Sequence, residues 1–170
     1  MSKPDKVEAT VLRLEDFNQT ELINLLKRYQ LEAQIVLSGQ AIPGSFWGDA
    51  EAGLIGRQLF LRQDTPIHSA LHETCHFVCM DDARRKQLNT NAGNSQAEEN
   101  AVCYLQILLA DDLLSLGRQR ILSDMDAWGY SFRLGSAKKW FEHDAQESRE
   151  WLLAYDLIDQ DNRSTYRLRL

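Results

Sequence analysis

Two histidines and a glutamate within one short run form the arrangement of greatest chemical content in this sequence. The run reads His72-Glu73-Thr74-Cys75-His76 and matches the pattern H-E-x-x-H. Residues four apart project from the same side of an α-helix, so His72 and His76 can bind one metal ion between them. Glu73 lies about 100° further round the helix, where its carboxylate can contact a water held by the metal. The spacing therefore predicts a zinc ion bound by the two histidines, with Glu73 as general base.

A catalytic zinc ion usually has three protein ligands and keeps a fourth position for water, so the pattern needs one more ligand. Glu98 is the first candidate, because it shares a face of a later helix with apolar residues, and a carboxylate there needs a partner. Its neighbour Glu99 projects about 100° away and is expected to be solvated or to support a ligand from outside the coordination sphere. Asp82 and Cys79 are the alternatives, Cys79 being a soft ligand on the same helix as the histidines.

Composition and charge are those of an ordinary globular protein. Of the 170 residues, 44% are hydrophobic and 26% are charged, and the 19 basic and 25 acidic residues give a net charge of −6. An acidic chain does not suit non-specific nucleic-acid binding, and no apolar run approaches the roughly 20 residues of a membrane span. Three cysteines without framework spacing do not predict disulfides. We expect a cytoplasmic protein that binds neither nucleic acid nor membranes, and the sequence leaves its oligomeric state open.

Strands are expected early in the chain and helices late, which is typical of an α+β fold in one domain over residues 1–170. Hydrophobic periodicity places helices over the following approximate ranges: 20–32, 66–80, 96–116 and 136–158. The second of these carries the H-E-x-x-H run, the third carries Glu98, and the fourth is the C-terminal helix.

The remaining segments should form a small mixed sheet and its connections. Short β-rich runs predict strands over 34–37 and 54–61. Polar composition predicts loops over 81–96 and 123–135, and a polar tail that frays from about residue 159.

The H-E-x-x-H run, followed on a later helix by Glu98-Glu99-Asn100-Ala101, resembles the gluzincin branch of the zincin metallopeptidases. The resemblance extends from Thr65 to roughly Leu105. It implies a compact zincin-like domain that hydrolyses peptide bonds. In that domain the zinc ligands would be His72, His76 and Glu98. The resemblance also makes the 54–61 strand the edge strand that lines the cleft, and the substrate would be a peptide or protein lying along it.

Two features depart from or compete with this resemblance. Thermolysin-like gluzincins carry, four residues after the third ligand, an acidic residue that orients a ligand histidine, and here that residue is Val102. The metzincins have a longer motif whose last position corresponds to Asp82, but Cys79 stands where that motif has a glycine. Met125 is the only feature suggesting their Met-turn. SprT-like proteins need a third histidine shortly downstream, and the next one here is His143.

Gluzincins commonly supply a Tyr or His, from downstream of the zinc ligands, that hydrogen-bonds the developing oxyanion. The resemblance makes Tyr130 and His143 the candidates for this role. His68, four residues before His72, is expected to bond a turn carbonyl. The competing function is a catalytically inactive zincin-like metal-binding module that recognises a protein partner, and a fourth protein ligand would distinguish it.

Overall fold

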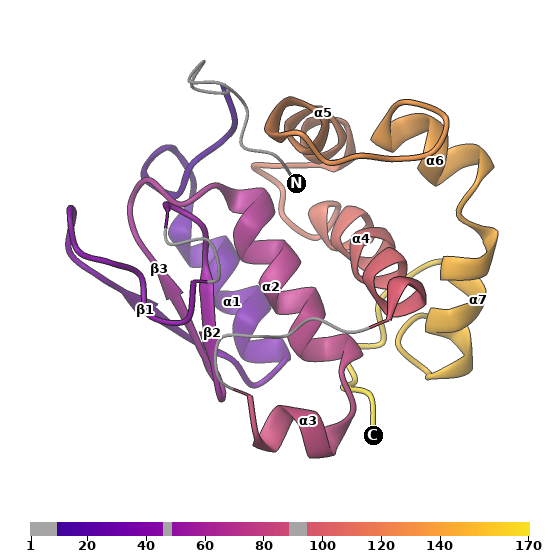
Figure 1. The fold of residues 1–170 in the computed structure, drawn as a ribbon, viewed down its shortest axis with the longest axis horizontal. Coiled ribbons are helices and arrows are strands. Elements are labelled where there is room, and N and C mark those ends of the chain that lie inside the picture. Colours follow the sequence, from indigo (N-terminus) through magenta and orange to yellow (C-terminus); the bar gives the residue numbers. More distant parts are fainter. Residues whose placement is uncertain (1–9, 46–48, 89–94) are drawn as a thin grey trace.

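Helices and a small sheet form an α+β fold in the computed structural model, which describes residues 10–45, 49–88 and 95–170 (Figure 1). The helices of this part are α1 (Gln19–Arg28), α2 (Ile67–Cys79), α3 (Asp82–Lys86), α4 (Gln96–Ala110), α5 (Arg118–Trp128), α6 (Ala137–His143) and α7 (Gln146–Ala154). The strands are β1 (Glu32–Ile35), β2 (Gly53–Ile55) and β3 (Gln58–Leu61). None of the described helices has the length and apolar character needed to cross a membrane.

The sheet is mixed, as expected, but the 54–61 segment is a hairpin and not one edge strand. The strand order is β1-β3-β2, with β3 parallel to β1 and antiparallel to β2. The chain reverses between Ile55 and Gln58, where Gly56 has φ +57°, a left-handed conformation that glycine adopts without steric cost. The prediction treated this glycine as part of a strand interior. Consequently β3 is the central strand and β2 is an edge strand.

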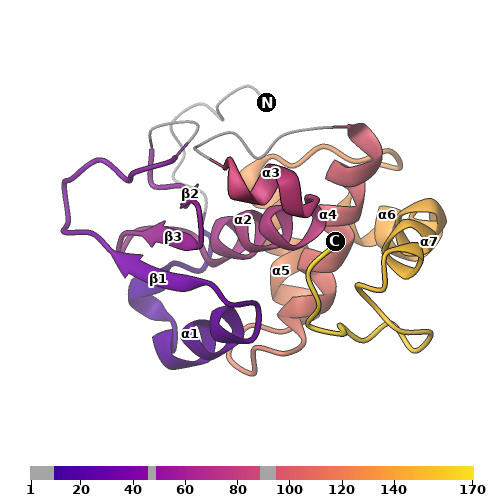
Figure 2. The ribbon, with the colours of Figure 1, turned by 90° about the horizontal axis from the view of Figure 1, so that it is seen from below.

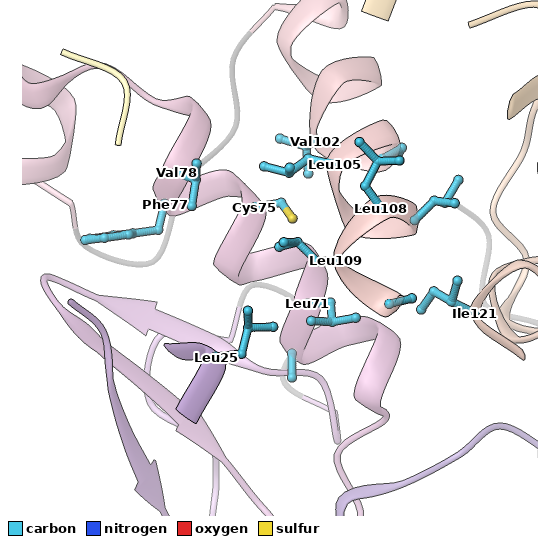
Figure 3. Close-up of a cluster of buried hydrophobic side chains, with 14 of the residues drawn as sticks. Leu25, Leu71, Cys75, Phe77, Val78, Val102, Leu105, Leu108, Leu109 and Ile121 are labelled. Carbon is cyan, nitrogen blue, oxygen red and sulfur yellow. The ribbon is translucent and has the colours of Figure 1, made fainter. Parts of the chain in front are cut away.

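Helix α2, which carries the H-E-x-x-H run, lies between the sheet and α4 (Figure 1). Leu71 and Cys75 are completely buried and point into the core that Val102, Leu105 and Leu109 of α4 complete (Figure 3). Burial on both sides explains why most of α2 is apolar or small. A buried helix also fixes the direction of any polar side chain that it carries, because its rotation is set by close packing.

Two helices form where loops were predicted. Helix α3 occupies part of the 81–96 segment, and the Asp81 carboxylate caps it by accepting from the Arg84 backbone N–H at 2.9 Å. Helix α5 (Arg118–Trp128) is flanked by Gly117 and Gly129, and Gly129 has φ +100° and ends the helix in the common left-handed form. Capping residues and a glycine stop were thus stronger signals here than the weak apolar periodicity.

The last predicted helix and the tail also differ from expectation. Residues 136–158 contain two helices, α6 and α7, with Asp144 between them outside helical geometry. The tail from residue 159 does not fray, because it crosses back over the helices and ends beside α3 (Figure 2). The Ser164 hydroxyl bonds the hydroxyl of Tyr29, the residue after α1, and the Arg169 backbone N–H donates to the Val78 carbonyl of α2 at 3.0 Å.

Truncating the α2 core should measure how strongly this helix is held. We expect Leu71→Ala to lower the free energy of unfolding by about 2–5 kcal/mol, because it removes a buried side chain and leaves a cavity. Leu114→Ala is the matched control, because Leu114 is 92% exposed and should change stability by less than about 0.5 kcal/mol. Chemical denaturation checks both, and equal effects would contradict the buried position of Leu71.

Candidate metal centre

The two histidines of the H-E-x-x-H run meet a glutamate of α4 at the contact between α2 and α4. The Nε2 atoms of His72 and His76 are 3.2 Å apart. The Glu99 carboxylate spans them, with Oε1 at 3.0 Å from His72 Nε2 and Oε2 at 3.1 Å from His76 Nε2. Within residues 10–45, 49–88 and 95–170, this is the one group of three or more His, Cys, Asp or Glu side chains whose ligand atoms lie close enough to hold a metal ion.

The separations between these atoms fit a small ion. Nitrogen and oxygen ligands at about 2.0–2.2 Å from a tetrahedral ion lie roughly 3.3–3.5 Å from each other. The two histidine nitrogens are 3.2 Å apart, and each lies 3.0–3.1 Å from a different oxygen of Glu99, so the two rings and the carboxylate need only slight expansion to reach this value. The Glu99 side chain is 37% exposed and that of His72 16%, so the cluster is open on one side. His72, His76 and Glu99 could therefore hold a metal ion.

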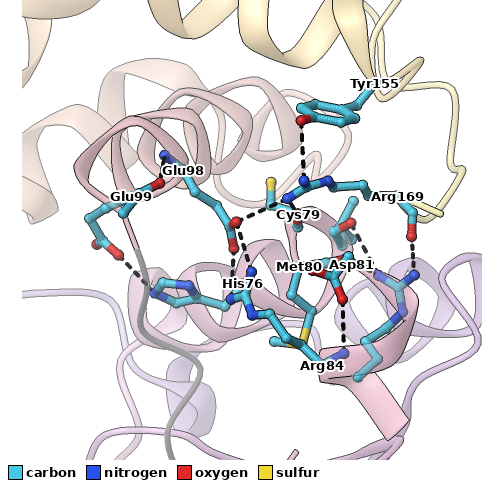
Figure 4. A network of polar contacts seen from close by, with 12 residues as sticks. His76, Cys79, Met80, Asp81, Arg84, Glu98, Glu99, Tyr155 and Arg169 are labelled. Atoms are coloured by element: carbon cyan, nitrogen blue, oxygen red, sulfur yellow. Dashed lines mark hydrogen bonds and ion pairs between the residues drawn. The ribbon is translucent and has the colours of Figure 1, made fainter.

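The structure places Glu99 at the position that the sequence analysis gave to Glu98. Glu98 is buried, as predicted, but its partners are arginines (Figure 4). Arg84 of α3 donates to both of its carboxylate oxygens, at 2.9 and 3.0 Å, and Arg169 of the tail donates to Oε2 at 3.1 Å. The buried Glu98 carboxylate does have the partner that its burial requires, but two arginines and not a metal ion provide it.

The burial of α4 explains why the apolar face of this helix did not identify Glu99 as the ligand. Glu98 points towards α3 and the tail, whereas Glu99 points towards His76 (Figure 4). Most of α4 is buried, so both of these sides face protein. An apolar neighbourhood along the sequence therefore marks more than one side of this helix and does not select the side that meets α2.

Neither alternative third ligand lies in the cluster. Asp82 is exposed on α3 and pairs with Lys86 at 2.8 Å. Cys79 is buried at the end of α2, where its backbone carbonyl accepts from Arg169 at 3.3 Å. The metzincin reading, which needs Asp82 at the metal, therefore has no geometric support among the described residues.

Two carboxylates at the cluster have different electrostatic environments. Burial raises the pKa of Glu73, and the nearby Glu51 and Glu99 carboxylates act in the same direction, against the two histidines. Burial would also raise the pKa of Glu99, but hydrogen bonds from His72 and His76 hold it well below its usual range. The lowered pKa keeps Glu99 ionised, as a metal ligand must be. The raised pKa makes the Glu73 carboxylate a stronger base than an ordinary glutamate.

A polar network lies behind His72, on the side away from Glu99. The Gln106 side chain of α4 is completely buried and lies 2.9 Å, through Oε1, from His72 Nδ1. The hydroxyl of Tyr130 is 3.1 Å from His68 Nδ1, and its ring centroid is 5.6 Å from that of His72. The sequence analysis missed Gln106, although it placed Val102 where gluzincins carry the orienting residue, and Val102 is simply a core side chain.

Of the two candidate oxyanion donors, the structure brings one to the cluster. Tyr130 lies in the network just described, whereas His143 is 69% exposed at the end of α6, with Glu142 as its nearest charged partner at 3.8 Å. His68 does not bond a turn carbonyl through its ring as expected. Its ring is buried against Tyr130 and Trp128, and burial lowers the pKa of His68 to about 3.

Comparison with known proteins does not indicate a function for this chain, so a functional proposal must rest on the geometry of the site. No family model, no curated protein and no solved structure matches the chain.

The two adjacent glutamates should respond differently to loss of charge. We expect Glu98→Gln to lower the free energy of unfolding by about 3 kcal/mol, because it leaves Arg84 and Arg169 facing a neutral buried amide. Glu99→Gln, at a partly exposed side chain, should cost much less in the metal-free protein.

Thermal and denaturant unfolding of the metal-free variants measure this difference. Asp144→Asn is the control for a charge pair on the surface, since Asp144 pairs with the exposed Arg133, and such pairs contribute little. Equal stability of Glu98→Gln and the wild type would contradict the role assigned to the arginine pairs.

Proposed function

We propose that this protein is a zinc-dependent peptidase, with zinc held by His72, His76 and Glu99 and with Glu73 as general base. The observation that carries the proposal is the number and kind of converging ligand atoms. Three side chains offer them within 4.8 Å of one another, and Glu73 stands beside them on the same helix without belonging to the set. Three protein ligands are typical of catalytic zinc, whereas structural zinc has four.

Zinc is the metal that this ligand set favours. Two imidazoles and one carboxylate are borderline ligands of the kind found in catalytic zinc sites. When bound, zinc lowers the pKa of a water molecule and polarises a carbonyl oxygen.

The side chains around the ligands supply the proton transfers and the hydrogen bonds of peptide hydrolysis. Glu73 would take the proton from the attacking water and deliver it to the leaving amine, and its raised pKa suits an acceptor that later acts as donor. Tyr130 packs against His72 and is the proposed donor to the oxygen that gains negative charge. This role requires its hydroxyl to turn away from His68 and Gln106, which it contacts in the polar network behind His72. The exposed His143 is not part of this proposal.

The edge strand β2 is attached to α2 close to the ligand histidines, which supports a substrate site between this strand and the metal cluster. The Ala52 backbone N–H, immediately before β2, donates to the Ser69 hydroxyl of α2 at 2.9 Å. Glu51, next to it, accepts from the Trp128 indole at 3.0 Å and lies close enough to influence the pKa of both Glu73 and Tyr130. A peptide or protein segment is the substrate class that the proposed chemistry implies.

Metal content tests the ligand assignment. We expect about one zinc per wild-type chain and a large loss of zinc affinity in Glu99→Ala, which removes one of three ligands. Glu98→Ala is the matched control from the neighbouring position, and its folded fraction should keep its zinc. Elemental analysis and titration against a competing chelator give both values, and loss of zinc in the Glu98 variant alone would overturn the assignment.

Activity tests the role of Glu73. We expect Glu73→Gln to retain zinc and fold, but to lose about 10²–10⁴-fold in the rate of peptide hydrolysis, because an amide cannot take the proton. Cleavage of a library of unstructured peptides, followed by mass spectrometry, provides the rate for both proteins. A zinc-loaded Glu73→Gln variant with wild-type activity would sink the mechanism.

A further inference from the structure

Gln106 is a buried polar side chain that the proposed chemistry does not use directly. It lies on α4, seven residues after Glu99, and has no exposed surface. Burying an amide that has no hydrogen-bond partners costs free energy, so the hydrogen bonds of Gln106 explain how it can be buried here. They all lead to the histidine side of α2 and to Tyr130.

The partners fix which end of the amide points to His72. The His68 backbone carbonyl lies 2.8 Å from one terminal atom of Gln106, and a carbonyl only accepts hydrogen bonds. That atom must therefore be the NH₂ nitrogen, which also lies 3.4 Å from the Tyr130 hydroxyl. The oxygen is consequently the atom that faces His72 Nδ1 at 2.9 Å.

The orientation of the amide determines where His72 carries its hydrogen. An amide oxygen accepts, so Nδ1 must be protonated whether or not Nε2 also carries a proton. The Nε2 lone pair is then the one available to a metal, and Nε2 is the atom that faces His76 and Glu99. Histidine ligands are commonly held in this way by an acceptor on the second ring nitrogen.

We infer that Gln106 is a positioning residue that holds His72 as an Nε2 ligand, and this inference rests on the proposed function. The fixed parts are the His68 carbonyl, which orients the amide, and α4, which supplies both Gln106 and Glu99. His76 differs, since its Nδ1 is buried and has no hydrogen-bond partner among the described residues. Only His72 is thus oriented by a side chain bonded to its second ring nitrogen.

An amide in this place differs from a carboxylate in charge. Two neutral imidazoles and one carboxylate leave a dication with a net charge of +1, and a neutral Gln106 does not reduce it. A carboxylate behind His72 would add a negative charge and make the ring a stronger donor to the metal. The inferred role therefore predicts different consequences for removing the acceptor and for charging it.

Gln106→Met and Gln106→Glu separate these effects. Met has a similar length but accepts no strong hydrogen bond, so we expect the zinc dissociation constant to rise about 10–100-fold. Glu restores an acceptor to His72 Nδ1 but, when ionised, cannot donate to the His68 carbonyl, so we expect only part of the affinity to return. Leu105→Met, one residue earlier in the same buried helix, is the matched control and should bind zinc as the wild type does.

Nitrogen-15 NMR of the zinc-loaded wild type gives a readout that does not depend on activity or on folding of a variant. We expect zinc on His72 Nε2 and a proton on Nδ1 that exchanges slowly with solvent; in Gln106→Met this signal should exchange rapidly or disappear. Zinc on Nδ1 in the wild type would overturn the inference.

The outcomes distinguish this inference from the proposed function. Zinc bound equally well by the wild type and Gln106→Met would overturn the positioning role and leave the ligand set intact. Equal weakening in the Met and Glu variants would show that the position acts through packing, which also overturns it. A wild-type protein that binds no zinc would overturn the proposed function itself.

Discussion

The packing of α2 against α4 is the contact on which the candidate site depends. Neither helix contains the whole site, because α2 carries His72 and His76 whereas α4 carries Glu99 and Gln106. The apolar residues between the helices set both their separation and their rotation, and interiors as dense as this allow little adjustment. The ligand atoms lie about 3 Å apart because the apolar side chains elsewhere in the interface fit together (Figure 3).

Adjacent glutamates on α4 have separate tasks because successive side chains of a helix point about 100° apart. Glu99 meets the histidines, and Glu98 meets Arg84 and Arg169. The second arrangement joins α3, the first turn of α4 and the tail in one buried ionic contact. It therefore contributes to the stability of the fold around the first turn of α4, from which Glu99 also projects.

Much of this architecture could be read from the sequence, where local signals are strong. The H-E-x-x-H spacing and the hydrophobic periodicity over 96–116 identified α2 and α4 as the helices that carry the site. The α+β class followed from strands that precede helices. These features depend on residues close together in the chain, and such signals are preserved in the sequence.

The rest depended on contacts between distant residues. Glu98 is held away from the histidines by Arg84, 14 residues before it, and by Arg169, 71 residues beyond it. Arg169 lies in a tail that polar composition alone predicts to be loose. Gln106 was visible as a polar residue on the Glu99 side of α4, but only the packing of α2 brings His72 against it. The sequence around Gly56 does not distinguish a glycine inside a strand from a glycine at which the chain reverses, as it does here.

The place of Arg169 also constrains the order of folding. Its guanidinium completes the buried partner set of Glu98, and its backbone N–H pairs with the end of α2. Contacts of such long sequence separation require a large loop to close and form late. During synthesis, helices α2 to α7 leave the ribosome before Arg169, and until it arrives Glu98 has only Arg84 as an arginine partner. The first turn of α4 therefore gains its last charged partner only after α7 has been synthesised.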